Sequence, residues 1–180
     1  MKQLNPIILI EHGVTLTPLD ESHLEMLRKW RNSEFVRRFM LYQEDISENQ
    51  QREWFARLKG SQKFYFIITD EAGEYGCCNV NLETDESGVC CAEGGIFSAE
   101  EGKLNSLTPI KAICSIYNWA FTSCGVAYIK ARIRNDNKRA IRFNHGLGFK
   151  VDHVTDGVTY ATLTKSSFEE RYSVMKRVLG

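Results

Sequence analysis

This sequence of 180 residues has no excess of positive or negative charge, because its lysines and arginines number 23 and its aspartates and glutamates also number 23. Proteins that hold nucleic acid electrostatically carry a basic surplus, so the balance argues against a nucleic-acid partner. A long apolar run is missing too. The stretch Pro6–Ile10 is too short to span a membrane and lacks the basic flank and cleavage site of a signal peptide. We therefore expect a cytoplasmic protein without a membrane partner.

Proline is rare and no segment is rich in glycine and proline, so the sequence offers no linker or low-complexity stretch at which to divide the chain. We expect one globular domain over residues 1–180. Cys-x-x-Cys spacing is also absent, and the four histidines are scattered, so no metal site is expected. The doublets Cys77-Cys78 and Cys90-Cys91 would point their sulfurs to opposite faces of a strand, as small apolar fillers kept reduced.

Helices and strands can be placed from caps and periodicity. Asp20 can cap a helix over Glu21–Arg31, and Ser47-Glu48-Asn49-Gln50 has the spacing of a capping box that opens a second helix. Three strands with turn signals between them then predict an antiparallel meander, at Lys63–Thr69, Tyr75–Thr84 and Val89–Phe97.

Thr108 is placed to cap the next helix, Pro109–Ser123, whose predicted buried stripe is Ile110, Ile113, Ile116, Tyr117 and Ala120. The remaining elements are a strand over Val126–Arg134, a helix over Asn137–Asn144 ended by Gly146 and Gly148, a hairpin of Phe149–Val154 and Val158–Leu163, and a last helix opened by a capping box at Ser166. This order favours a mixed α/β (α+β) fold with a largely antiparallel sheet.

One stretch carries a resemblance to a known family. Asn137-Lys138-Arg139-Ala140, followed by Gly148-Phe149, resembles the Asn-x-x-Ala helix start and Gly-Phe strand entry of the Gcn5-related N-acetyltransferase (GNAT) family. The predicted order of elements is similar to that of the family as well. The resemblance implies a single-domain N-acetyltransferase with acetyl-CoA as cosubstrate and Asn137 at the pantetheine arm. A helix cap and a glycine stop would explain the same residues without any ligand.

Trp30-Arg31-Asn32 resembles a segment in two branches of that family. One branch acetylates the N-termini of ribosomal proteins, and the other acetylates nucleotide-linked amino sugars, as in pseudaminic acid synthesis. The resemblance implies that these three residues bind substrate, with Arg31 gripping a phosphate and Asn32 reading a sugar hydroxyl or amide. Alternatively, Trp30 belongs to the core and the other two form a solvated helix end.

The chain departs from the family where the coenzyme pyrophosphate should bind. Leu107 and Pro109 stand where the family has glycines, and proline has no N–H to donate. The groups that could replace those donors are Lys103, Ser106, Thr108, Lys111 and Arg139, besides the backbone at Leu107. We expect weakened coenzyme binding at this loop.

By the same resemblance, the thioester would lie beside Gly95 and the backbone of Ile96, Phe97 and Ser98. Glu93 shares a strand face with Gly95, which makes it the predicted general base, although it could be an ordinary exposed carboxylate. Asn144 falls where many relatives have an acidic tyrosine. Asn144 cannot supply a proton, so His145 is the alternative acid, unless it is a surface histidine.

Three functions stay open at this point: acetylation of a small-molecule amine on a nucleotide-linked sugar, acetylation of protein N-termini, and non-catalytic binding through the same fold. The altered pyrophosphate loop supports the third of these. Asn137 and the Trp30–Asn32 segment support the first two. The sequence also leaves a homodimer open.

Overall fold

The computed structural model describes residues 7–179. Its strands are β1 (Leu9–Glu11), β2 (Val14–Pro18), β3 (Lys63–Asp70), β4 (Gly73–Thr84), β5 (Cys90–Ser98), β6 (Tyr128–Arg134), β7 (Lys150–Thr155) and β8 (Val158–Thr164). Its α-helices are α1 (Leu24–Asn32), α2 (Glu34–Arg37), α3 (Glu48–Ala56), α4 (Thr108–Ser123), α5 (Lys138–Leu147) and α6 (Lys165–Leu179), and 3-10 helices cover Glu21–His23 and Glu101–Asn105.

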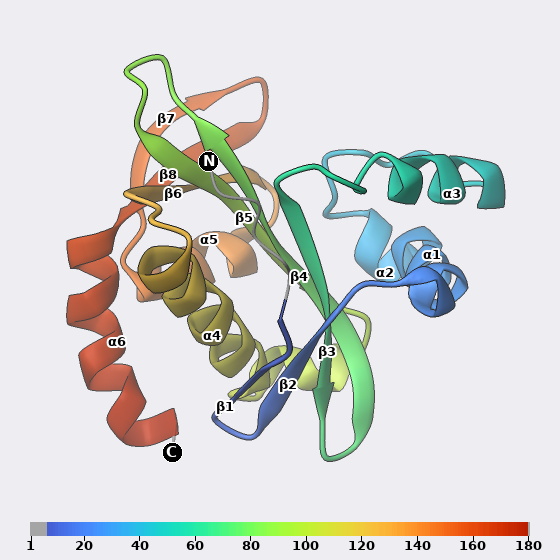
Figure 1. Ribbon diagram of the computed structural model, residues 1–180, viewed down its shortest axis with the longest axis horizontal. Coiled ribbons are helices and arrows are strands. Elements are labelled where there is room, and N and C mark those ends of the chain that lie inside the picture. Colours follow the sequence, from blue (N-terminus) through green and yellow to red (C-terminus); the bar gives the residue numbers. More distant parts are fainter. Residues whose placement is uncertain (1–6, 180) are drawn as a thin grey trace.

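The strands form one sheet of eight in the order β1-β2-β3-β4-β5-β6-β8-β7, and only β5 and β6 pair in parallel among the described strands. Helices α4 and α6 lie on one side of the sheet, and α1, α2 and α3 lie on the other (Figure 1). The predicted meander and C-terminal hairpin are confirmed, as is the mixed, largely antiparallel α/β fold. No helix within residues 7–179 is both long and apolar enough to cross a membrane.

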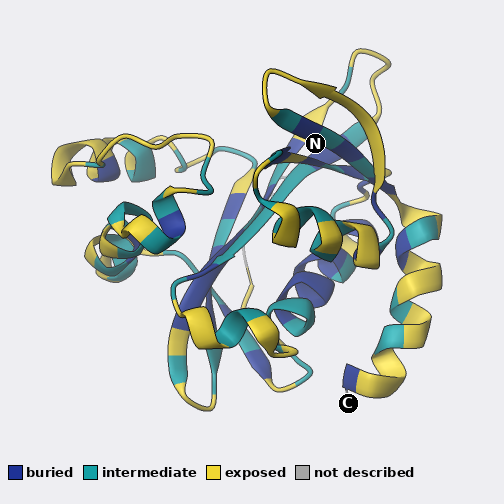
Figure 2. Cartoon of the chain, turned by 180° about the vertical axis from the view of Figure 1, so that it is seen from behind, coloured by how far each residue is buried: buried dark blue, intermediate teal, exposed yellow. Residues whose placement is uncertain are grey.

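The main core lies between the sheet and α4, which is the dark blue helix at the centre of Figure 2. Four of the five predicted stripe residues are buried, and Ile110 packs at the edge of this core. A second, smaller cluster lies on the opposite face, under α1 and α3. The doublet on β4 divides between the two, since Cys78 joins the main core and Cys77 the smaller cluster. The prediction that the doublet separates its sulfurs is confirmed.

Two predicted helix starts are capping boxes in the structure. Asp20 Oδ1 accepts the Ser22 N–H at 2.8 Å and begins the turn that leads into α1. Ser47 and Gln50 bond reciprocally at the start of α3. These signals act within a few residues, which is why sequence alone locates them.

Thr108 does not cap α4, contrary to the prediction. It is the first helical residue, and Leu107 holds the cap position without a side-chain bond. The hydroxyl of Ser106 accepts the Thr108 N–H at 3.3 Å instead. The capping group thus lies two residues earlier, because the preceding 3-10 helix leads almost directly into α4.

The predicted start of α6 is wrong by the same interval. Ser166 lies inside the helix, and Thr164 Oγ1 accepts the Ser167 N–H at 3.2 Å. Gly146 lies within α5, and only Gly148, at φ +103°, ends it in the left-handed conformation. The sequence does not predict β1 or α2, which are too short to show a period. The single-domain prediction remains untested, and Met1–Pro6 and Gly180 lie outside the described residues.

A close contact between β5 and α4 generates the first prediction. A Cβ at Gly94 would lie 2.5 Å from the Tyr117 hydroxyl oxygen and 2.7 Å from its ring. Tyr117 is fully buried and cannot move aside. We expect Gly94→Ala to lower the free energy of unfolding by about 1–3 kcal/mol in chemical denaturation. Gly102→Ala, where a Cβ would meet nothing, is the matched control. Equal stability of the two variants would contradict this packing.

Candidate active site

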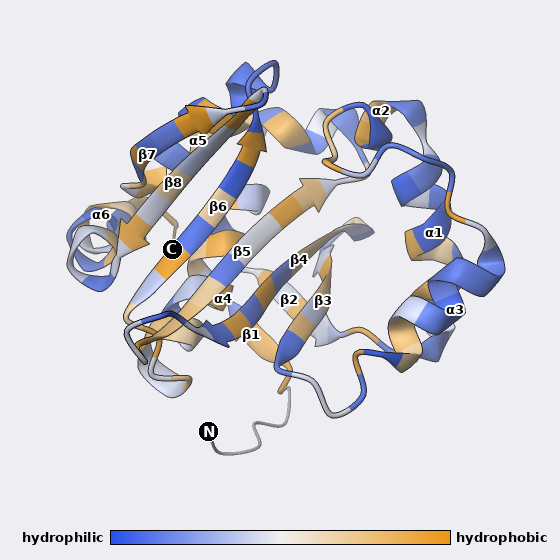
Figure 3. Ribbon diagram, turned by 90° about the horizontal axis from the view of Figure 1, so that it is seen from above, coloured by the Kyte–Doolittle hydropathy of each residue, from blue (hydrophilic) through white to orange (hydrophobic). Residues whose placement is uncertain are grey.

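The sheet opens between β5 and β6. Their ladder has three residue pairs, the last of which joins Glu93 to Lys130. Beyond that pair β5 runs on beside β4 to Ser98, while β6 runs on beside β8 to Arg134. Figure 3 shows the two strands starting side by side and drawing apart toward their arrowheads. Because no described strand lies along β5 from Gly94 onward, its backbone on that edge is open to an extended ligand.

Polar side chains lie next to this opening, on the sheet face that α1 and α3 overlie. Along β4, Asn79 and Asn81 alternate with buried apolar residues. The ladder pairs Asn79 with Gly95 and Asn81 with Glu93, so the four lie together on one face. A Cβ at Gly95 would lie 2.9 Å from Asn79 Oδ1, so the glycine makes room for the amide.

Glu93, the predicted base, pairs with Arg132 across the point where β5 and β6 separate. Its Oε1 accepts from Arg132 Nε at 3.0 Å and from Nη2 at 2.8 Å. These hydrogen bonds raise the pKa of Arg132. Both side chains are partly exposed, at 31% for Glu93 and 46% for Arg132. Because the guanidinium occupies Oε1, a proton reaches Glu93 at Oε2 or after the pair opens.

The other predicted contacts on β5 have their side chains engaged in packing. Ile96 packs against the main core and Phe97 against the smaller cluster. The buried Ser98 hydroxyl donates to the Glu100 carbonyl at 2.8 Å and closes the turn that ends the strand. Any contact of these three residues with a coenzyme would therefore come from the backbone, as predicted.

The predicted phosphate ligands before α4 are largely engaged within the chain. Lys103 Nζ lies 2.5 Å from Asp70 Oδ2. Burial tends to raise the pKa of Asp70, but the hydrogen bonds from Lys103 and the Ala72 N–H bring it below its ordinary value. The Ser106 hydroxyl donates to the Lys103 carbonyl at 2.7 Å, and Leu107 is exposed. Few side chains here are free to donate to a phosphate, and weakened coenzyme binding at this loop remains a prediction.

On α5, Asn137 is a helix cap, because its Oδ1 accepts the Ala140 N–H at 3.1 Å. Asn144 donates from Nδ2 to the Ala140 carbonyl at 2.9 Å, within its own helix. His145 and Arg139 are exposed. The roles predicted for these residues toward coenzyme and substrate remain predictions.

The three residues at the end of α1 differ in their contacts. Trp30 packs against the smaller cluster, which agrees with the alternative that it belongs to the core. The side-chain amide of Asn32 donates from Nδ2 to the Ile46 carbonyl and accepts the Ile46 N–H at Oδ1, both at 2.9 Å, which fixes the segment between α1 and α3. Arg31 is half-buried and has no carboxylate partner among the described residues.

Three polar residues of this face were missed by sequence analysis: Tyr65, Asn79 and Asn81. The alternation Asn79-Val80-Asn81-Leu82 was a usable signal, since a strand with one apolar face shows polar residues on the other. Tyr65 gave no such signal, because it stands in an aromatic run.

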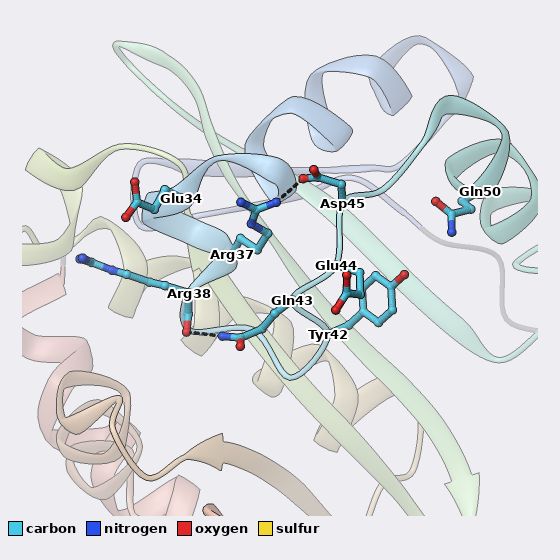
Figure 4. A pocket seen from close by; sticks show the side chains of 8 residues that line it. All are labelled: Glu34, Arg37, Arg38, Tyr42, Gln43, Glu44, Asp45 and Gln50. Carbon is cyan, nitrogen blue, oxygen red and sulfur yellow. Dashed lines mark hydrogen bonds and ion pairs between the residues drawn. The ribbon is translucent and has the colours of Figure 1, made fainter.

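Two surface cavities lie away from the opening. One, of about 610 Å³, is lined by residues of α2, α3 and the loop between them, where Arg37 pairs with Asp45 and Gln43 bonds the Arg38 carbonyl (Figure 4). The other, of about 1070 Å³, lies between α1, α3 and the adjoining ends of β2 and β3. No residue of β5 or β6 lines either cavity, but Tyr65 of the polar face lines the larger one.

Comparisons with known proteins agree with this architecture. The apo structure of FdhC, described as a nucleotide-linked sugar GNAT, superposes with a TM-score of 0.80 at 18% identity, covering 97% of this chain and 99% of that one. Spermidine N-acetyltransferase from Vibrio cholerae, in complex with CoA and spermine, gives 0.76 at 16% identity over 88% and 99% of the two chains. Aminoglycoside acetyltransferase AAC(6')-Ib with coenzyme A gives 0.74 at 20% identity over 87% and 98%.

A search among curated protein sequences finds no match. The family comparison is decisive: residues 14–150 match the family described as acetyltransferase (GNAT) domain, which is more than half of the chain. Acetyl-CoA is the cosubstrate that this family uses. The protein is therefore a member of the GNAT acetyltransferase family.

Proposed function

We propose that this protein transfers an acetyl group from acetyl-CoA to a primary amine on a nucleotide-linked sugar. The observation that carries the proposal is the opening beyond Glu93 and Lys130, which joins a free backbone edge to a polar sheet face. Acetyl-CoA supplies an acyl group activated as a thioester. The open edge of β5 fits the extended part of the coenzyme, with Gly95 beside it, whereas the loop before α4 offers few free donors for phosphate.

In this mechanism the chain orients the amine and removes its proton. No covalent bond to the protein is needed, because the amine attacks the thioester carbonyl directly. Unpaired N–H groups on β5 would bond the oxyanion that develops. Glu93, at the narrow end of the opening, is the proposed base. His145 is the proposed acid, since the Asn144 amide is bonded within its own helix.

The sugar assignment is supported by the likeness to FdhC over nearly the whole of both chains and by the Trp30-Arg31-Asn32 segment. The second candidate is acetylation of protein N-termini, which the same segment favours. A non-catalytic role is the third, and the engaged side chains before α4 favour it. A cytoplasmic location and a homodimer remain predictions, as does the absence of nucleic-acid and membrane partners.

The discriminating experiment is an acetyl-transfer assay that measures the free thiol released. It compares a panel of amino-sugar nucleotides with peptides that have free N-termini. Turnover of the sugar nucleotides is expected. Turnover of peptides alone would overturn the sugar assignment and leave the acetyltransferase intact. No turnover of any amine by a protein that binds the coenzyme would support the non-catalytic alternative.

Glu93→Gln should lower kcat on the best acceptor by roughly 100-fold or more, because a positioned base contributes at least that much. Acetyl-CoA affinity should not change. Glu83→Gln is the matched control, since Glu83 also pairs with a cation of β6, Lys130, and lies two residue pairs further from the opening in the β4–β5 ladder. Equal losses in the two variants, or full activity of Glu93→Gln, would remove Glu93 from the mechanism.

Asn137→Ala should lower the free energy of unfolding by about 1 kcal/mol, because the α5 cap is lost. Asn137→Ser should restore stability, since serine also caps helices. If the Asn137 amide also bonds the pantetheine arm, coenzyme affinity measured by calorimetry falls in both variants, by about 1 kcal/mol. Full coenzyme affinity in Asn137→Ser would show that Asn137 acts only as a cap.

A further inference from the structure

Two buried polar atoms on the face of the proposed site lack a hydrogen-bond partner among the described residues. They are Arg31 Nε and Asn81 Oδ1. An unpaired buried donor or acceptor is costly, and few survive in a folded protein without a ligand or water to satisfy them. One atom is a donor on a cation and the other is an acceptor. Together they fit a ligand that presents an anionic group and an N–H.

The surroundings of Arg31 supply no negative charge. Three cations of this face lie on β6, and each has a carboxylate within the chain: Lys130 with Glu83, Arg132 with Glu93, and Arg134 with Asp136. Lys63, which pairs with Asn81 in the β3–β4 ladder, is exposed and has no ion pair among the described residues. The groups that interact electrostatically with Arg31 are instead Tyr65 and Cys77. Burial raises the pKa of Cys77 to about 12 and also raises that of Tyr65, so both groups stay neutral. For the cation Arg31 burial acts in the opposite direction and lowers the pKa, because it disfavours the charged form.

Asn81 lies at the other end of the same surface, directly opposite Glu93 in the β4–β5 ladder. Side chains of such a pair are neighbours on one face. A substrate amine that donates to Asn81 Oδ1 therefore lies beside the proposed base. The amide of Asn81 also contacts the Tyr65 hydroxyl, which connects this end of the surface to Arg31.

The charges of this face limit the ligand. A polyamine or an aminoglycoside would bring positive charge toward an unpaired guanidinium. An acceptor that carries an anionic group as well as an amine would bring the opposite charge.

We propose that Arg31 and Asn81 form a two-point subsite that selects acceptors carrying a phosphate or carboxylate as well as the amine and rejects polycationic amines. This inference rests on the proposed function, and it names the charge that the acceptor must carry. Arg31 holds the anionic group, and Asn81 accepts a hydrogen bond from the amine next to Glu93.

Thiol release would be measured with glucosamine 1-phosphate, an amino sugar with a carboxylate, neutral methyl glucosaminide, and spermine. In the native protein, kcat/KM for at least one anionic acceptor should exceed that for the neutral one by 10-fold or more, and spermine should be poorest. The phosphate and carboxylate arms tell the two anions apart. Arg31→Gln should bring the ratio close to one. Lys29→Gln removes an exposed charge from the same helix and should keep the ratio. A ratio near one in the native protein, or an unchanged ratio in Arg31→Gln, would overturn the subsite.

Binding measurements keep this inference separate from the proposed function. If no amine is acetylated, the transferase proposal fails, but calorimetry with glucosamine 1-phosphate and methyl glucosaminide still tests the subsite. The phosphate should bind at least 10-fold more tightly, and Arg31→Gln should abolish the difference. Arg31→Met should raise the melting temperature by a few degrees, because it removes an unpaired cation. Equal affinities for the two sugars, or a lowered melting temperature in Arg31→Met, would show that Arg31 is a structural residue.

Discussion

Three residue pairs are all that join β5 to β6, and the two halves of the sheet depend on that short parallel ladder. On its other edge β5 pairs with β4, and on its other edge β6 pairs with β8. Helix α4 packs beneath and joins the halves through one continuous core, so the ladder can end early without the sheet coming apart. Gly94 lies just past the last pair and admits the Tyr117 ring, which brings α4 close under the opening. The free edge of β5 is therefore held on a rigid support.

The two faces of β4 and β5 have different roles, one in the core and the other in the proposed site. Residues facing α4 are mostly apolar and bury the core. The opposite face carries Cys77 and Phe97 of the smaller cluster at one end and Asn79, Asn81, Glu93 and Gly95 beside the opening. Strand alternation places both sets on the same few residues. A substrate on the polar face would meet Asn79, Asn81 and Glu93 together, beside the edge of β5 that is proposed to hold the acyl donor. Arg31, a half-buried cation whose Nε has no partner among the described residues, is the group that the proposed subsite assigns to the substrate anion.

Local signals in the sequence located most elements. The capping box of Ser47 is determined by a few adjacent residues. So is the turn at Asp156-Gly157, in which both residues have positive φ. The stripe of α4 was readable for the same reason. The end of the β5–β6 ladder was not, because no residue near Glu93 marks where a partner distant in sequence turns away. The burial of Arg31 was equally hidden, since it depends on how α1 lies on β3 and β4. At Asn137 the sequence pattern fits a helix cap and a coenzyme ligand equally well, so the sequence alone does not decide between these two roles.

The measurement that tests this account most directly is a calorimetric titration of the protein with coenzyme A. The account predicts saturable binding of one coenzyme per chain. It also predicts that a large side chain beside the free edge, as in Gly95→Trp, abolishes binding, whereas the exposed substitution Val174→Trp on α6 leaves it intact. Absence of binding at millimolar coenzyme, or equal binding by both variants, would contradict the central claim that the opening between β5 and β6 receives the acyl donor.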